Sequence, residues 1–266
     1  MNHEVRHAAK IFTRGEREAI FDYWTHERLA NARPATLPGL DRRAKSNHCE
    51  APAFGEAYPV DVNVLPYNAG GKLFFTDEKG EDHYGTAQFC GSGQMVLTAA
   101  HLVRDPFSGN YHTNILFIRA YDRGFGEGYT FERIKTHDKW IGENRGFDYA
   151  FGYTDHPAAY WVVLRAGGPY LDMVMIGYPE NYDKETMWGA DGRLEDWDSV
   201  AGIITMKESP MKAGSSGGAW LWKDYDRDEI LALGLTAGGD EAEPLIEGPL
   251  FTQDILSLFH EVDNAE

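Results

Sequence analysis

A short run of glycines and serines in the C-terminal third of the chain has the residue types for nucleophilic chemistry. The run is Gly214-Ser215-Ser216-Gly217-Gly218, and glycines on both sides of a serine allow a tight turn that exposes its hydroxyl. In such a turn the backbone N–H groups of Gly214 and Ser216 can point together at an oxygen that gains negative charge. Taken alone, however, such a run more often marks an ordinary loop between strands.

Two further segments carry a histidine and an aspartate that fit the same chemistry. His101 ends the apolar run Leu97-Thr98-Ala99-Ala100, where a strand would deliver it to the edge of a cleft as a general base. Asp148 stands among apolar residues in Phe147-Asp148-Tyr149-Ala150-Phe151, and its burial requires a hydrogen-bond partner such as an imidazole N–H. Each residue also has a simpler interpretation, a satisfied core histidine for His101 and a turn residue for Asp148.

The order and local contexts of these three residues resemble those of the chymotrypsin-like serine peptidases. His101, Asp148 and Ser216 follow one another at separations of 47 and 68 residues, and a His–Asp–Ser triad in that order is typical of the family. Within the family the chain is most similar to the V8-like, glutamyl-endopeptidase branch. That similarity rests on the segments Gly177-Tyr178-Pro179, Met187-Trp188, Gly192 and Gly234-Leu235-Thr236-Ala237-Gly238-Gly239.

The resemblance covers about residues 58–262 and implies an all-β fold of two six-stranded barrels with an active site in the cleft between them. It implies a serine endopeptidase that acts on polypeptides through an acyl-enzyme, with no metal and no organic cofactor. His101 would be the general base, Asp148 would orient and stabilise the imidazole, and Ser216 would be the nucleophile. The N–H groups of Gly214 and Ser216 would form the oxyanion hole. The implied substrate-binding residues are Met211, Thr236, Ala237, Gly238 and Gly239.

Several positions depart from the family pattern in ways that bear on activation and specificity. Ser215 stands where trypsin-type members have an aspartate that pairs with a new N-terminal amine, so this activation switch is predicted to be absent. Thr236 replaces the carboxylate-binding histidine of glutamyl endopeptidases, and Met211 lies near the place of trypsin's aspartate. Neither glutamate nor Lys/Arg specificity therefore has a clear anchor. An acidic run after the wall strand is interpreted as a solvated loop or as part of the pocket; its residues are Asp240, Glu241 and Glu243.

The first 50 residues differ from the rest in their sequence pattern and are predicted to form a helical extension and linker. Thr13-Arg14-Gly15-Glu16 has the form of a capping box, and the apolar residues that follow predict a helix near 14–31. This segment also resembles the region before the peptidase domain in secreted relatives, where it behaves as a pro-region. Cleavage of the charged linker between about Leu40 and Pro59 would release the extension, with new termini after Glu50 or Glu56.

Beyond the linker, short apolar runs separated by turn residues predict one peptidase-like domain over 51–266. We expect a first barrel over about 58–158, a second over about 159–248 and a C-terminal helix over about 251–262. Regular helices do not alternate with the runs, which argues against a doubly wound α/β fold. The predicted strands are 72–76, 94–99, 114–120, 160–165, 173–178, 201–206, 218–222 and 230–237.

The composition excludes several classes of protein. The 266 residues carry 25 Lys and Arg against 42 Asp and Glu, a net charge of −17, which argues against nucleic acid as a partner. No run of about 18 apolar residues occurs, so we expect no membrane association through a spanning segment. The only cysteines, Cys49 and Cys90, allow one disulfide, although a buried free thiol is the simpler interpretation of Cys90.

The chain shows no secretory signal. Leu102 also follows the histidine where many secreted relatives have a cysteine paired with one near Cys90, so that bridge cannot form. Both features favour a cytoplasmic protein, or a secreted one if a leader precedes this chain. We expect a monomer unless the protein docks to a regulator.

Two other functions are compatible with the same residues. A peptide-binding module can keep the fold without catalysis, and an esterase-like hydrolase can use the same triad on small acyl substrates. An organofluorophosphonate probe distinguishes these classes, because it would label Ser216 in either hydrolase and not in the binding module. Only a peptidase would also cut unfolded proteins.

Overall fold

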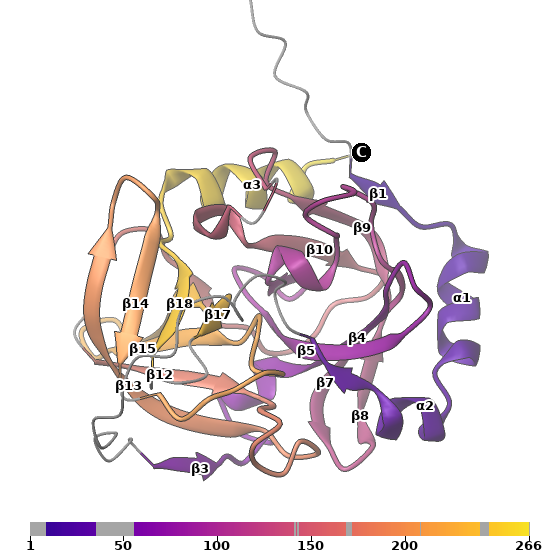
Figure 1. Cartoon of the computed structure of the whole chain (residues 1–266), viewed down its shortest axis with the longest axis horizontal. Helices are drawn as coiled ribbons and strands as arrows, with labels where there is room; N and C mark the ends of the chain where they lie inside the picture. Colours follow the sequence, from indigo (N-terminus) through magenta and orange to yellow (C-terminus); the bar gives the residue numbers. More distant parts are fainter. Residues whose placement is uncertain are drawn as a thin grey trace, which may run out of the picture.

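Two curled β-sheets lie side by side and make up most of the structure (Figure 1). The computed structural model describes residues 9–35, 56–140, 142, 144–168, 172–207, 209–239 and 245–265, and within these residues each sheet has nine strands. The first sheet contains β1 (Lys10–Ile11), β2 (Arg33–Pro34), β4 (Gly70–Thr76), β5 (Asp82–Phe89), β6 (Met95–Thr98), β7 (Thr113–Asp122), β8 (Phe125–Tyr129), β9 (Phe131–Thr136) and β10 (Ala150–Thr154). The second contains β3 (Ala57–Pro59), β11 (Val163–Leu164), β12 (Asp172–Gly177), β13 (Trp188–Asp198), β14 (Ile203–Lys207), β15 (Ala219–Asp224), β16 (Glu229–Leu235), β17 (Gly238–Gly239) and β18 (Ile246–Pro249).

The strand count and the start of the first sheet differ from the expectation of two six-stranded barrels. Short strands of the extension enlarge the first sheet: β1 pairs with β9 at its edge, and β2 pairs with β5 in its interior. The first barrel was placed from about residue 58, but β3 pairs with β13 of the second sheet. After the extension, the first sheet therefore begins at β4.

The chain crosses from the first sheet to the second near Val162. This residue forms an isolated bridge with Cys90, on the first-sheet side, and the next two residues pair with β16 as β11. The predicted strand over 160–165 is consequently reduced to Val163–Leu164. The other seven predicted strands are confirmed with bounds shifted by a few residues, as β4, β6, β7, β12, β14, β15 and β16.

Two short helices, rather than one, follow β1. The capping box at the start of α1 (Arg14–Tyr23) is confirmed, because the Glu16 N–H donates to Thr13 Oγ1 and the Thr13 N–H donates to Glu16 Oε2. The helix ends at Trp24, and Thr25 begins α2 (His26–Asn31) by accepting a hydrogen bond from the Arg28 N–H. The break allows the Trp24 side chain to turn into the core, where it is 6% exposed.

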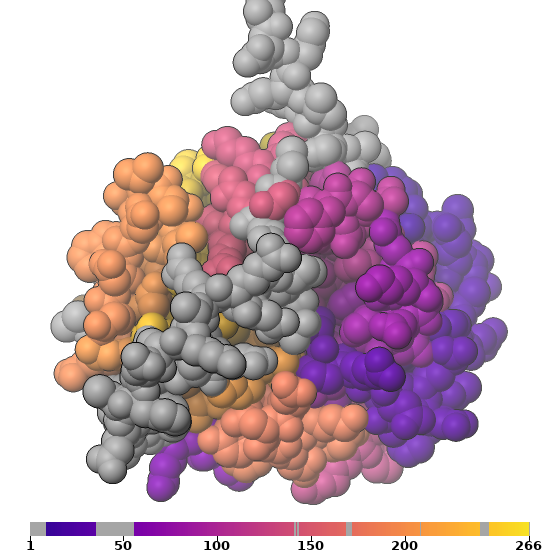
Figure 2. Space-filling model, in the orientation of Figure 1, coloured from indigo at the N-terminus to yellow at the C-terminus, as the bar shows by residue number. Residues whose placement is uncertain are grey.

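The N-terminal extension is packed on the outer face of the first sheet (Figure 2, indigo). The Trp24 indole N–H donates to the Asn114 carbonyl at 2.6 Å, and its ring lies 5.4 Å from that of Phe74. The Tyr23 hydroxyl donates to Asp82, which also pairs with Arg28. These contacts lie outside the linker, so they would persist after linker cleavage. Leu40 and Glu50, between which the linker runs, lie outside the described residues.

Replacing Trp24 with alanine is expected to destabilise the whole protein by about 3–5 kcal/mol, because it removes a large buried ring and leaves a cavity. The matched control is Phe21→Ala on the same helix, whose ring is 45% exposed and whose loss should cost less than about 1 kcal/mol. Chemical denaturation of both variants measures the difference. Equal stability of the two would show that the extension is not part of the cooperative fold.

A C-terminal helix, α3 (Gln253–Asp263), follows the second sheet but packs on the first. Thr252 caps its N-terminus by accepting from the Asp254 N–H, and Phe259 makes an edge-on contact with Phe151 of β10. At the other end, the Arg133 guanidinium of β9 donates to the Val262 carbonyl at 2.6 Å. The helix therefore ties the end of the chain back to the first sheet. Among the residues described, no helix is long and apolar enough to cross a membrane.

Cys90 is a free, fully buried thiol, and burial raises the pKa of this thiol above its usual value. Leu102 packs against Gly85 instead, where an added Cβ would lie 2.5 Å from Leu102 Cδ1. Hydrophobic contact therefore takes the place of a bridge after His101. Cys49 lies outside the described residues.

Candidate active site

Asp148 and His101 meet at the same end of two paired strands. Thr98 of β6 is directly opposite Ala150 of β10, so the residue two before Ala150 lies beside the turn that follows β6. That turn, a 3₁₀ helix over Ala100–Leu102, carries His101. The sequence places the pair because an antiparallel register brings the end of one strand to the beginning of its partner.

The His101–Asp148 contact is a two-point hydrogen bond in a buried environment. His101 Nδ1 lies 2.8 Å from Asp148 Oδ2, and the His101 backbone N–H donates to Asp148 Oδ1 at 2.9 Å. The side chains of His101 and Asp148 are 2% and 0% exposed. An ionised carboxylate only accepts hydrogen bonds, so Nδ1 carries the imidazole proton. In the neutral imidazole Nε2 is then a lone-pair acceptor, and it is buried with no hydrogen-bond partner among the described residues.

Ser216 lies in a tight turn between β14 and β15, which we call the nucleophile loop (residues 214–218). Gly214 has φ +92°, and a Cβ at this position would lie 2.3 Å from the Tyr178 carbonyl oxygen, so only glycine fits. Three of the loop's N–H groups donate to carbonyls, those of Ser215, Gly217 and Gly218. The N–H groups of Gly214 and Ser216 donate to no residue that the structure describes.

The first sheet contacts the nucleophile loop at β5 and at Leu102, the residue after His101. The Thr86 N–H of β5 donates to the Ser216 carbonyl at 2.7 Å, and β5 pairs with β6, the strand that leads to His101. Leu102 lies against the other side, where a Cβ on Gly217 would be 3.0 Å from Leu102 Cδ1. His101 and Asp148 are thus in direct contact, and Ser216 lies in the adjoining loop, although no hydrogen bond to His101 Nε2 is formed among the described residues.

Thr236 joins the predicted substrate-binding wall to the nucleophile loop. Its carbonyl accepts from the Gly217 N–H at 2.7 Å, and its own N–H donates to the Gly218 carbonyl at 2.9 Å. The Thr236 hydroxyl accepts a hydrogen bond from the Trp220 indole at 2.9 Å. The hydroxyl is therefore already engaged in the core, unlike a ligand-binding histidine.

The other predicted substrate-binding residues lie on either side of Thr236. Met211 is 3% exposed in a cluster that includes Met206 and Trp220. Ala237 is buried, and its N–H donates to the Glu247 carbonyl. Gly238 and Gly239 are half-buried and form β17 against β18. Asp240, Glu241 and Glu243 lie outside the described residues.

Ser215 satisfies its hydroxyl locally. Ser215 Oγ donates to the Lys212 carbonyl at 2.6 Å, and the Ser215 N–H donates to the same oxygen at 3.2 Å. The residue is 2% exposed. A neutral hydroxyl bonded to a nearby carbonyl needs no ammonium partner, in contrast to a buried carboxylate at this position.

A buried cation lies behind the nucleophile loop. Lys72 is 0% exposed, and its ammonium donates to the Lys184 carbonyl and pairs with Glu185. It also lies 4.1 Å from the ring centre of Tyr84, the ring that packs against Gly214. Burial lowers the pKa of Lys72 to about 8, although the Glu185 carboxylate opposes that shift.

An acid-rich pocket borders His101 on the first sheet. The described residues that line it include three acidic ones, Asp77, Glu78 and Asp105, and a single lysine, Lys79. Although burial opposes it, backbone N–H groups of Glu81 and Lys79 hold the pKa of Asp77 below its usual value, so this carboxylate is charged at neutral pH. Three carboxylates and one lysine therefore give the pocket beside His101 an acidic lining.

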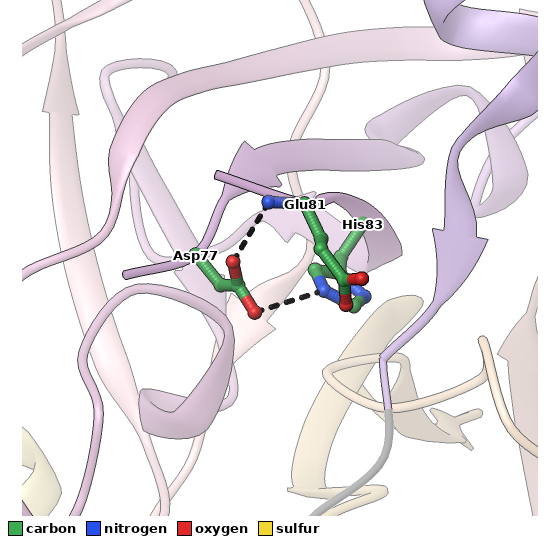
Figure 3. A group of neighbouring side chains, drawn as sticks. All are labelled: Asp77, Glu81 and His83. Atoms are coloured by element: carbon green, nitrogen blue, oxygen red, sulfur yellow. Dashed lines mark hydrogen bonds and ion pairs between the residues drawn. The ribbon is translucent and has the colours of Figure 1, made fainter. Parts of the chain in front are cut away.

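One group of side chains at the edge of this pocket has the donor types of a metal site (Figure 3). The ligand atoms of Asp77, Glu81 and His83 all lie within 4.8 Å of one another, and Asp77 Oδ2 pairs with His83 Nε2 at 3.3 Å. Carboxylate and imidazole ligands suit a divalent metal ion. The His101–Asp148–Ser216 group needs no such ion for its chemistry.

Comparison with solved structures identifies the fold. The chain is similar to the protease Anisep from Arthrobacter nicotinovorans, with 20% identity and a TM-score of 0.65, over 80% of this chain and 99% of the other. It is similar to the thermostable serine protease AL20 from an extremophilic microorganism, with 20% identity, a TM-score of 0.64 and coverage of 74% and 98%. It is also similar to a Glu endopeptidase, with 16% identity, a TM-score of 0.66 and coverage of 81% and 99%.

No protein-family model matches the sequence, and no curated protein is similar to it in sequence. The structural neighbours nevertheless match over almost their whole lengths, and the two curled sheets and the C-terminal helix agree with them. The all-β fold expected from the sequence is confirmed: the chain has the chymotrypsin-like double β-barrel fold of the serine peptidases.

Proposed function

We propose that this protein is a serine endopeptidase that hydrolyses polypeptides through an acyl-enzyme. One observation carries the proposal: Asp148 Oδ2 lies 2.8 Å from His101 Nδ1, which favours the Nδ1–H tautomer of the neutral imidazole, and the buried Nε2 has no partner among the described residues. This is the protonation state that a general base needs before it accepts a proton from a serine hydroxyl. The nucleophile loop lies against Leu102, the residue that follows this histidine.

In the proposed mechanism Ser216 attacks the substrate carbonyl while His101 Nε2 takes the hydroxyl proton. Asp148 keeps the imidazole in the correct tautomer and stabilises the cation that forms. His101 then donates the proton to the leaving amine, and water hydrolyses the acyl-enzyme by the reverse sequence of proton transfers. Each step uses groups of this chain and water alone.

The tetrahedral intermediate carries a negative oxygen, and the N–H groups of Gly214 and Ser216 would bind it. Their lack of an acceptor in the described chain supports this role, because a donor already bonded within the protein gains nothing in the transition state. Each such donor is worth about 3–4 kcal/mol. The substrate segment before the scissile bond would lie along Thr236–Gly239, with Met211 at the base of the primary pocket.

The experiment that tests the proposal is active-site labelling of the full-length protein with an organofluorophosphonate. We expect a single adduct on the peptide that contains Ser216, and no adduct in His101→Ala, because the probe reacts with an activated serine. His156→Ala is a suitable control, since the His156 side chain is 44% exposed, pairs with Asp155 and has no proposed role in proton transfer.

Each outcome selects among the three candidate functions. Lack of labelling in the wild type would favour a peptide-binding module of this fold. Labelling accompanied by hydrolysis of small esters, without cleavage of denatured protein, would favour an esterase-like hydrolase. Labelling together with cleavage of denatured protein is the result expected of the endopeptidase.

A further inference from the structure

We infer that Thr86 and Gln88, two buried residues of the first barrel, are positioning residues that set the geometry of the nucleophile loop of the second barrel. The inference rests on the proposed function and goes beyond it, because neither residue belongs to the triad or to the oxyanion hole. Thr86 and Gln88 are 0% and 1% exposed. They are two apart on β5, so their side chains leave the strand on the same face.

Thr86 binds the loop at two points around the nucleophile. Its N–H donates to the Ser216 carbonyl at 2.7 Å, and its hydroxyl donates to the Gly214 carbonyl at 2.9 Å. The same hydroxyl accepts from the Tyr178 N–H at 3.2 Å. Its donor and one acceptor position are therefore used, and its orientation is fixed by two different segments of the second barrel.

Gln88 binds the other end of the loop. Its side-chain amide NH₂ donates to the Gly217 carbonyl at 3.1 Å and to the Leu97 carbonyl at 2.8 Å. Its amide oxygen accepts from the Ala219 N–H at 2.8 Å. A single side chain thus connects β6, which leads to His101, with both the end of the nucleophile loop and the start of β15.

These bonds matter for the oxyanion donors because each peptide group is planar and trans. The carbonyl and the N–H of one peptide point in opposite directions, so a bonded carbonyl also fixes its N–H. The Ala213 carbonyl accepts from the Glu180 N–H, and the Ser215 carbonyl accepts from the Gly218 N–H; their peptides carry the free N–H groups of Gly214 and Ser216. The peptide between these two carries the Gly214 carbonyl, which Thr86 holds.

The carbonyls of Ala213, Gly214 and Ser215 are therefore all hydrogen-bonded, and the bond to Gly214 comes from β5 of the first barrel. Removal of the Thr86 hydroxyl leaves the Gly214 carbonyl and the Tyr178 N–H buried without this partner, and the middle peptide of the oxyanion hole then keeps only the 3.2 Å bond from the Ser215 N–H to the Lys212 carbonyl. A displacement of about 1 Å in a catalytic group can reduce the rate about 100-fold. Substrate binding along Thr236–Gly239 would change less, since Ala237 and the strand Gly238–Gly239 are held by bonds to β18.

The test uses Thr86→Val, which keeps the shape of the side chain and removes the hydroxyl, in the full-length protein. We expect both the rate of Ser216 labelling by the fluorophosphonate and kcat for a cleaved peptide to fall about 10- to 100-fold, with KM changed less than about threefold. Thr86→Ser, which retains the hydroxyl, should remain within about threefold of the wild type in both measurements.

The matched control is Thr130→Val. Thr130 is equally buried in the first barrel, and its hydroxyl donates to Asp155, away from the nucleophile loop. This variant should lose stability without losing kcat or labelling rate. If Thr86→Val does not fold, Gln88→Met is measured in its place. It removes both hydrogen bonds of Gln88 to the second barrel, and we expect the same loss of labelling rate and kcat.

Two results would overturn the inference, and they are distinguishable. If the wild type is labelled and a folded Thr86→Val or Gln88→Met variant is labelled at the same rate, the loop keeps its geometry without these side-chain hydrogen bonds from β5. A wild type that is not labelled at all would refute the proposed function, and the positioning role with it.

Discussion

Replacement of Ser216 with alanine is expected to lower the rate of peptide cleavage by about 10⁶-fold, the size of loss seen when the nucleophile of a triad is removed. His101 then has no hydroxyl to deprotonate, and an acyl-enzyme cannot form. The residual rate would come from binding and from the N–H groups of Gly214 and Ser216 alone. Cleavage-site profiling by mass spectrometry on a denatured, proteome-derived peptide library measures the effect, since a loss of this size removes all serine-dependent cuts.

A matched variant separates this loss from damage to the fold. Ser257→Ala removes another serine hydroxyl, one that bonds to the Gln253 carbonyl on the exposed side of α3, and should leave every cut in place. Cuts that persist at full rate in Ser216→Ala would mean that another residue is the nucleophile or that a contaminating peptidase is present. The same data give the residue preference before the bond, and hence show whether Thr236 in the wall is compatible with cleavage after glutamate.

Two of the candidate catalytic residues could be proposed from the sequence because each stands next to a local signal. His101 follows an apolar strand, and Ser216 lies in a glycine-rich turn that only a positive φ at Gly214 can complete. The capping box of Thr13 and Glu16 was predictable for the same reason, since its hydrogen bonds span only three residues.

Elements that depend on distant parts of the chain were not predictable in this way. β13 reads as a polar segment, Trp188–Asp198, because much of it is exposed, and its strand structure comes from pairing with β12 and β14. The same holds for the break at Trp24 between α1 and α2, which a helical period does not indicate. The indole must reach the first sheet, and a carbonyl 90 residues away accepts its N–H.

Buried polar residues are the clearest case. Lys72, Thr86 and Gln88 lie in ordinary-looking strands, and polar side chains usually point to solvent. Here Lys72 reaches a glutamate 113 residues away, and Thr86 and Gln88 reach carbonyls 128 and 129 residues away. Only their partners on the second barrel reveal them. The sequence indicates them only through the spacing of Thr86 and Gln88, two polar residues that are two apart on one strand.

Replacement of Asp148 with asparagine is the second large effect, and we expect kcat to fall about 10⁴-fold with little change in KM. The His101 backbone N–H would still donate to the amide oxygen, which leaves the NH₂ group facing Nδ1. Nδ1 must then accept that hydrogen bond, so the imidazole proton moves to Nε2. In this tautomer Nε2 cannot accept the Ser216 proton, although the geometry of the site is nearly unchanged.

The comparison with Asp155→Asn makes this prediction specific. Asp155 also pairs with a histidine, His156 Nδ1 at 2.9 Å, but that imidazole is 44% exposed and lies outside the cleft. The same substitution there should leave kcat and Ser216 labelling unchanged. A folded Asp148→Asn variant that retains more than about a tenth of the wild-type kcat would contradict the assigned role, because control of the tautomer is the whole basis of the expected loss. Thermal unfolding of both variants shows that the difference arises in the proton transfer and not in the fold.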